Sequence, residues 1–206
     1  MICACLLILD QVQEGHPKRV EPPKDWVELA SPRREFTLWA PAGWRVWDPK
    51  DEALQQLVGE LNDLHPGFAA ALKARRPGRD DVMQAFNFED TADDGVIDSI
   101  AVSIQRELRI TPGHLRQIGA MIAKDLEKVG KIEYDTKLTP FGLTLYYSGT
   151  LSLPAGSTFV STDVYANMFI TGNDLVGVHF QTGAGRLKSQ LPVFDKIVAT
   201  GIRRMR

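Results

Sequence analysis

Polar side chains with useful chemistry recur at every second position between residues 143 and 182 of this chain. They are Tyr146, Ser148, Asp163, Tyr165, Asn167, His179 and Gln181. Hydroxyl, carboxyl, amide and imidazole groups gathered on one surface can bind a polar ligand or a protein partner. A solvated or helix-covered outer face of a sheet needs the same alternation, and we prefer that interpretation.

Three of these residues have the types found in a hydrolytic triad: Ser148, His179 and Asp163. A catalytic serine sits on a sharp turn beside an oxyanion hole, commonly in a G-x-S-x-G context. Ser148 lies in the middle of an expected strand and lacks that context. We therefore predict no catalytic residue and no enzymatic activity, and keep an unrecognised hydrolase or a small polar ligand-binding protein around His179 as the alternative.

The alternation itself predicts three antiparallel strands with one apolar face and one polar face. If the apolar faces of the strands stay together, the register of each hairpin can differ only by an even number of residues. A four-residue loop over residues 154–157 would set Tyr146 opposite Tyr165 and Ser148 opposite Asp163. A three-residue loop over residues 172–174 would set Asn167 opposite His179. These pairings would bring the polar residues named above into one patch.

The remaining elements follow from periodicity and turn residues. Strands are expected over residues 36–40, 44–48, 82–88, 96–108 and 132–138, and helices over residues 51–64, from Pro66, over residues 112–129 and from Pro192. Helices that lie outside a run of sequential strands indicate an α+β fold, an antiparallel meander with helices packed on it. We expect an apolar N-terminus and flexible leader over residues 1–24 and a single domain over residues 25–206.

Neither the histidines nor the cysteines have the spacing of metal ligands, so no metal and no cofactor are predicted. The acidic run from Glu89 to Asp94 lacks the order of a calcium-binding loop, and a solvated turn is the preferred interpretation. Residues 183–186, with the sequence Gly-Ala-Gly-Arg, are too short a glycine pattern for a phosphate cradle. They are interpreted as a flexible connection.

The bulk composition excludes some partners. A net charge of −2 gives no strong attraction to nucleic acid, and no apolar stretch approaches the length of a transmembrane helix. The apolar residues 1–9 precede a polar, proline-bearing run, in the order of an export signal followed by a leader. We favour export or a cell-envelope location over a cytoplasmic one, with membrane anchoring through the N-terminus. A misassigned start at Met1 would explain why no basic residue precedes the apolar run, and the open alternative to export is a short buried strand or a disordered tail.

The segment from Phe36 to Trp44, with its aromatic, extended stretch, Pro41, Gly43 and tryptophan, resembles the opening of PsbP-like domains. That superfamily includes the photosystem II extrinsic subunit, the Ran-binding Mog proteins, DcrB-like proteins and LpqN-like lipoproteins. The resemblance covers roughly residues 34–203. It implies an αβα sandwich around an antiparallel sheet and a non-catalytic role in docking or assembly. It transfers no functional residue to this chain.

Two tryptophans near the first strands, Trp39 and Trp47, are a second candidate partner surface, since aromatic residues are enriched at binding hot spots. Core packing is the more frequent fate of tryptophan. The preferred hypothesis is an interaction or accessory domain with an unknown protein partner. Its candidate binding residues are Tyr146, Asp163, Tyr165, Asn167, His179, Trp39 and Trp47.

Overall fold

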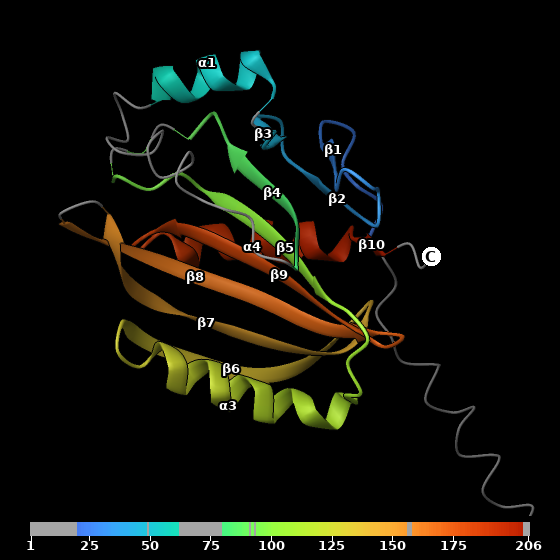
Figure 1. Ribbon diagram of the computed structural model, residues 1–206. Coiled ribbons are helices and arrows are strands. Elements are labelled where there is room, and N and C mark those ends of the chain that lie inside the picture. The colour runs from blue at the N-terminus through green and yellow to red at the C-terminus, as the bar shows by residue number, and fades with distance from the viewer. Residues whose placement is uncertain are drawn as a thin grey trace, which may run out of the picture.

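The computed structural model describes residues 20–48, 50–61, 80–90, 92, 94–155 and 158–203. Its main element is a seven-stranded antiparallel sheet in the order β3-β4-β5-β9-β8-β7-β6 (Figure 1). The strands are β3 (Trp44–Val46), β4 (Asp81–Asn87), β5 (Ser99–Gln105), β6 (Gly130–Thr139), β7 (Gly142–Ala155), β8 (Thr158–Thr171) and β9 (Asp174–Gly183). The predicted α+β class with its antiparallel meander is confirmed.

A smaller three-stranded sheet packs beside the main one. It has the order β1-β2-β10, with β1 at Val27–Ala30, β2 at Phe36–Ala40 and β10 at Ile202–Arg203. The sequence analysis anticipated only β2. Since β1 has four residues and β10 has two, neither is long enough to show a period of two.

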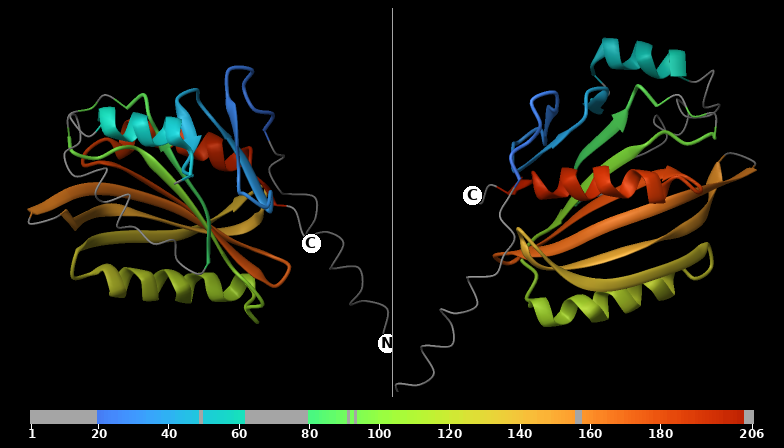
Figure 2. Two further views of the ribbon diagram at one scale, coloured as in Figure 1. Left: turned by 45° about the horizontal axis from the view of Figure 1, so that its top comes forward. Right: turned by 180° about the vertical axis from the view of Figure 1, so that it is seen from behind.

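Helices cover both faces of the main sheet. Helix α4 (Leu187–Ala199) crosses one face and contacts strands β8, β9 and β2 (Figure 2). Its Phe194, Ile197 and Val198 belong to the core cluster on that face. Helix α3 (Leu115–Leu126) follows a short 3₁₀ turn at Pro112–His114 and runs beside β6 on the other face. The chain is therefore layered as a sandwich, helix on sheet on helix.

Helix α1 (Glu52–Leu61) lies at the β3 end of the sheet. Its Val58 packs against Phe86 and Ile97. The helix expected from Pro66 falls outside the described residues. The last helix was expected to begin at Pro192, but it begins at Leu187 and contains Pro192. Asp163 accepts hydrogen bonds from the amides of Gly185 and Leu187, and this caps the helix well before the proline.

The predicted register between β7 and β8 is wrong by two residues. Tyr146 pairs with Asn167 and Ser148 with Tyr165, because pairing continues to Ala155 and Thr158 past Pro154. A proline need not end a strand where its missing N–H is not required by the neighbour. A shift of two preserves which face each side chain occupies.

The predicted register between β8 and β9 is wrong by one residue, and that changes the face. Thr171 pairs with Asp174 across the two-residue turn Gly172–Asn173, in which Gly172 has φ of 62°. His179 consequently pairs with Ala166. The parity argument assumed a single apolar face, whereas α3 and α4 bury apolar residues on both faces of this sheet.

Candidate binding face of the sheet

Beside α4, the sheet leaves a partly open surface on strands β6 and β7, which we call the polar face. It consists of Glu133, Asp135, Lys137, Tyr146, Ser148 and, from α4, Asp195. The side chains of Glu133 and Asp135 are 80% and 55% exposed, and Tyr146 and Ser148 are half-buried. The pleat produces this surface, because residues paired across an antiparallel ladder share a face.

Lys137 is held at the centre of the polar face. Its Nζ donates to the Tyr165 hydroxyl at 2.6 Å and to Asp195 Oδ1 at 2.9 Å. The same Nζ lies 5.1 Å from the centroid of the Tyr146 ring and 5.3 Å from that of Tyr165. Both distances are within the range of a cation–π interaction. The ammonium group is therefore paired and fixed, and the half-buried ring of Tyr146 lies next to it.

Tyr165 is a support for this arrangement and not a reactive group. Burial, followed by its hydrogen bond to Asp195, raises the pKa of its phenol far above the ordinary value. The phenol therefore stays protonated and cannot act as a base at any physiological pH. Its effect is to hold Lys137 and Asp195 in one geometry.

Asn167 is paired with Tyr146 across the β7–β8 ladder, two residues from Tyr165 on the same face, and is fully buried. Its Oδ1 is 3.5 Å from the Tyr165 hydroxyl, whose single proton is already directed to Asp195. Its Nδ2 has no hydrogen-bond partner among the described residues. Asn167 cannot touch a partner directly from this position. It is a buried residue on the side of the polar face, beside Tyr146 and Tyr165.

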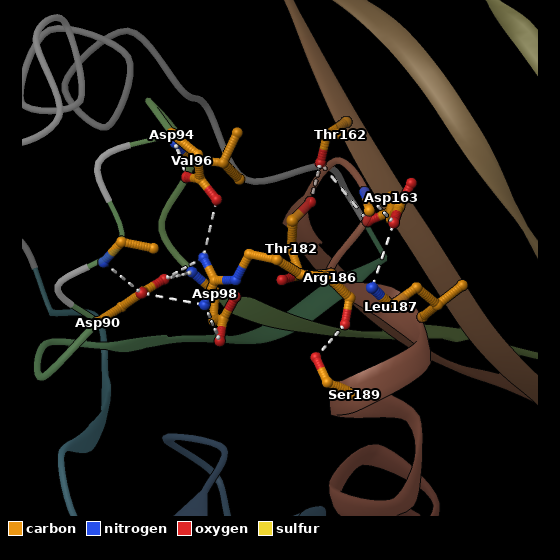
Figure 3. A network of polar contacts seen from close by, with 12 residues as sticks. Asp90, Asp94, Val96, Asp98, Thr162, Asp163, Thr182, Arg186, Leu187 and Ser189 are labelled. Carbon is orange, nitrogen blue, oxygen red and sulfur yellow. Dashed lines mark hydrogen bonds and ion pairs between the residues drawn. The ribbon is translucent and has the colours of Figure 1, made fainter.

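Asp163 lies on the same side of the sheet but serves another purpose (Figure 3). Its carboxylate accepts hydrogen bonds from the Thr150 hydroxyl at 2.7 Å, the Gly185 amide at 2.8 Å and the Leu187 amide at 3.2 Å. The residue is 5% exposed. These contacts place a buried carboxylate at the first turn of α4, where the helix dipole favours negative charge.

His179 does not join the polar patch predicted from the sequence, because the register places it on the opposite face. Its ring lies between the Tyr147 hydroxyl, 3.0 Å from Nδ1, and Ser103 Oγ, 3.3 Å from Nε2. Burial lowers its pKa to about 4, with a smaller opposing effect of Asp81. Ser103 lies in the middle of β5, without the turn that presents a catalytic serine. The neutral ring links two strands through hydroxyl groups.

The two candidate tryptophans occupy different packing units. Trp39 lies in β2 of the small sheet, where its backbone N–H donates to Thr200 Oγ1 at 3.0 Å. Trp47 follows β3 and packs against the cluster of Val58, Phe86 and Ile97. Both indoles are half-buried. Neither lies on the polar face.

A network around Arg186 was not predicted from the sequence (Figure 3). The guanidinium group donates to both carboxylate oxygens of Asp90 at 3.0 Å, to Asp94 at 3.1 Å and to Asp98 at 3.1 Å. The side chains of Asp90 and Asp98 are each 3% exposed. The interpretations of a solvated acidic turn and a flexible Gly-Ala-Gly-Arg connection are therefore wrong: Arg186 ties the two segments together.

Asp90 and Asp98 share the guanidinium group of Arg186, yet their pKa values shift in opposite directions. Burial acts to raise the pKa of Asp90, but hydrogen bonds from Arg186 and from backbone amides outweigh it and lower that pKa. Burial also raises the pKa of Asp98, to about 6, and the nearby Asp90 and Asp94 add to the rise. Asp98 Oδ1 and Thr182 Oγ1 are buried without a well-formed hydrogen bond in the described structure. The only sequence signal for this network is the spacing of four between the aspartates.

The described residues include neither a group of metal ligands nor a membrane-spanning helix. Within the described ranges, no group of three histidine, cysteine, aspartate or glutamate side chains is arranged to hold a metal ion. No helix in the part of the chain that the structure describes is long and apolar enough to cross a membrane.

Solved structures that are similar to this chain include proteins of the group that the resemblance named. The Ran-binding protein Mog1p of Saccharomyces cerevisiae has 11% sequence identity to this chain and a TM-score of 0.50, over 86% of this chain and 95% of its own. Cyanobacterial PsbP from Synechocystis sp. PCC 6803 has 11% identity and a TM-score of 0.48, over 93% and 99%. LpqN of Mycobacterium tuberculosis, described as involved in cell envelope biogenesis, has 9% identity and a TM-score of 0.47, over 94% and 95%.

No known protein family matches the sequence of this chain, and no curated protein matches it either. At identities near one residue in ten, the structural similarity establishes the fold alone. The function has to be argued from the side chains of this chain.

Proposed function

We propose that this chain is a non-catalytic binding domain that contacts a protein partner through its polar face. The observation that carries the proposal is the fixed arrangement of Lys137 between Tyr165, Asp195 and the Tyr146 ring. Lys137, Tyr165 and Asp195 are hydrogen-bonded to one another. The arrangement suits recognition better than catalysis.

Preorganisation is the physical reason for this choice. Ordering a free lysine or tyrosine at an interface costs about 0.5–1.5 kcal/mol per side chain. The bonds from Lys137 to Asp195 and Tyr165 already restrict the lysine before any partner arrives. Tyr146 stands beside it with a ring and a hydroxyl, the combination enriched at hot spots. Mog1p, the fold neighbour described above as Ran-binding, is an example of protein binding by this architecture.

The test uses purified protein as bait in an extract of the native host, followed by calorimetry with each purified candidate partner. Tyr146→Ala should weaken the binding of a true partner by about 2 kcal/mol, or roughly 30-fold in Kd. Tyr134→Ala is the matched control, since Tyr134 is a partly exposed tyrosine on the opposite face of the neighbouring strand. The affinity of the Tyr134→Ala variant for the partner should stay within about twofold of the wild-type value, as is usual for a residue outside an interface.

A partner that binds the Tyr146→Ala and Lys137→Met variants as tightly as the wild type would refute the polar face as the site. Circular dichroism and thermal unfolding must show both variants folded. Trp39→Ala and Trp47→Ala are measured beside these variants. If the partner binds at the tryptophans and not at the polar face, one of these two substitutions should abolish binding.

Export and N-terminal membrane anchoring are also proposals, as is the domain boundary near residue 25. They rest on residues 1–24, of which 1–19 lie outside the described residues. Fractionation of the native host with an antibody against residues 80–203 would test them. Recovery of the protein only in the cytosolic fraction would refute export.

A further inference from the structure

Strand β6 forms one end of the seven-stranded sheet. It pairs with β7 along all ten of its residues, from Gly130 to Thr139. Among the described strands, none pairs with its other side. An edge of this length presents a row of backbone N–H and C=O groups to another strand, and natural proteins manage such edges through their side chains. Here the N–H of Thr136 donates to Asp135 Oδ1 at 2.7 Å, and a second strand would compete with this local hydrogen bond.

The side chains of β6 alternate in a way that can distinguish partners. On the side of the polar face they are Lys131, Glu133, Asp135 and Lys137. On the side of α3 they are Ile132, Tyr134, Thr136 and Leu138. Leu138 is 57% exposed and Tyr134 39% exposed, which makes them two of the exposed large apolar side chains of the described chain.

We propose that β6 is a self-association edge, on which a second copy of this chain pairs antiparallel through its own β6, with Asp135 on the two-fold axis. Glu133 of each copy then lies opposite Lys137 of the other, so that two complementary charge pairs form. On the α3 side, Leu138 of each copy lies opposite Ile132 of the other. Directly opposed residues are the main contributors to sheet pairing.

Charge and the length of strand that is paired together select this register over its neighbours. Centring the pairing on Thr136 would form two Asp135–Lys137 pairs but leave residues 130–132 without a strand opposite them. Centring the pairing on Tyr134 would set Glu133 against Asp135 and Lys131 against Lys137, which are like charges and destabilising. Centring it on Glu133 would form two Lys131–Asp135 pairs but leave Lys137, Leu138 and Thr139 without a strand opposite them. Only the register on Asp135 combines opposite charges with nearly the full length of the strand.

The structure also provides for the residues at the centre of this pairing. Lys137 Nζ has three protons, of which Tyr165 and Asp195 accept two, so the third can serve Glu133 of the second copy. The two central Asp135 carboxylates would repel each other if bare. Arg116 of α3 lies 3.3 Å from Asp135 in each copy and supplies a compensating charge.

Sedimentation velocity over a concentration series tests the proposal. The wild type should self-associate, and Glu133→Lys or Lys137→Glu should each weaken association by about tenfold, because each creates like-charged opposite pairs. Mixing the two variants should restore a heterodimer, in which every pair is again complementary. Lys188→Glu is the control, since it reverses a charge at an exposed position on α4, outside β6, and should leave the affinity within about twofold of the wild type.

Oxidative cross-linking gives a readout that does not depend on charge reversal or on the folding of the Lys137 variant. In a background of Cys3→Ser and Cys5→Ser, Asp135→Cys should cross-link to itself across the axis, and Glu133→Cys should not. A monomeric wild type at every concentration would overturn the proposal. So would equal cross-linking of both cysteine variants, or a dimer that neither charge variant weakens.

Discussion

Replacing Asp98 with asparagine should remove a pH dependence of folding stability that this one carboxyl group creates. Asp98 is buried beside Arg186, Asp90 and Asp94, and its pKa is raised to about 6 from the ordinary 3.8. Asparagine keeps an oxygen to accept from Arg186 and adds an amide that can donate to Thr182 Oγ1. The substitution therefore removes the charge with little change in shape.

The sign follows from proton binding. Between about pH 4 and pH 6 the folded protein holds the Asp98 proton and the unfolded chain has released it. The free energy of unfolding therefore falls as pH rises through that window, by about 3 kcal/mol in total for this pKa difference. Asp90 acts in the opposite direction, because its lowered pKa makes its stabilisation disappear only below its ordinary pKa of 3.8.

The assay is urea unfolding, followed by tryptophan fluorescence, at several pH values from 4.5 to 7.5. The Asp98→Asn variant should be at least as stable as the wild type at pH 7.5, and its advantage should shrink as pH falls. Asp125→Asn, an exposed position on α3, is the control and should parallel the wild type. If the profiles of wild type and Asp98→Asn also run parallel, then Asp98 titrates normally and the electrostatic argument for the Arg186 network is wrong.

Three further substitutions test the packing described above. Asp163→Ala removes the cap of α4 and should cost about 2 kcal/mol of unfolding free energy, measured by urea unfolding. Gly177→Ala places a methyl group 2.4 Å from the Nε2 of His179, so the ring should move and its pKa, followed by NMR, should rise from about 4 towards its ordinary 6.5. Gly149→Ala directs a methyl group at the backbone carbonyl of Lys131 and should destabilise the β6–β7 pairing by about 1–3 kcal/mol, measured by urea unfolding.

Each of these has an outcome that contradicts it. Gly59→Ala is the control for the two glycine substitutions, since its added methyl group meets open space in α1 and should stabilise the helix by up to about 1 kcal/mol. A Gly149→Ala variant as stable as this control would mean that β6 is not paired as described. An unchanged His179 titration in Gly177→Ala would show that the ring does not lie over Gly177. An Asp163→Ala loss below about 0.5 kcal/mol would show that the cap is dispensable.

Side-chain periodicity was sufficient to predict the long strands and the α+β class. Strand β7 shows why: Tyr146 and Ser148 lie on its half-open face, while Leu145 and Tyr147 are buried under α3. A strand with one wet face shows a clear alternation of polar and apolar residues. The resemblance carried by Phe36 to Trp44 pointed to the same architecture.

Strand β9 shows where the prediction could not succeed. Its apolar residues Val176, Val178 and Phe180 pack under α4, on the face that carries Tyr165 in β8. Periodicity shows that side chains alternate but not which helix covers which face. The two-residue turn at Gly172 sets the register between β8 and β9. Because the turn was predicted one residue too long, His179 was assigned to the wrong face.

The Arg186 network was beyond the sequence for a different reason. Arg186 and Asp90 are 96 residues apart, and no periodicity links groups at that separation. Their meeting depends on β5 lying next to β9, an adjacency of strands far apart in the chain. The turn residues beside the aspartates are typical of a solvent-exposed loop. Only the tertiary arrangement brings a guanidinium group to these carboxylates.

The place of β9 between β5 and β8 also constrains how the chain reaches this fold. Ribosomes deliver the N-terminal half first, yet β3, β4 and β5 have no link to β8, β7 and β6 until residues 174–183 have been made. The nascent chain therefore keeps the edge of β5 unpaired from residue 105 onward, and β8 presents a second open edge until β9 follows it. Such late, long-distance closure slows folding and favours protection by chaperones before β9 is inserted.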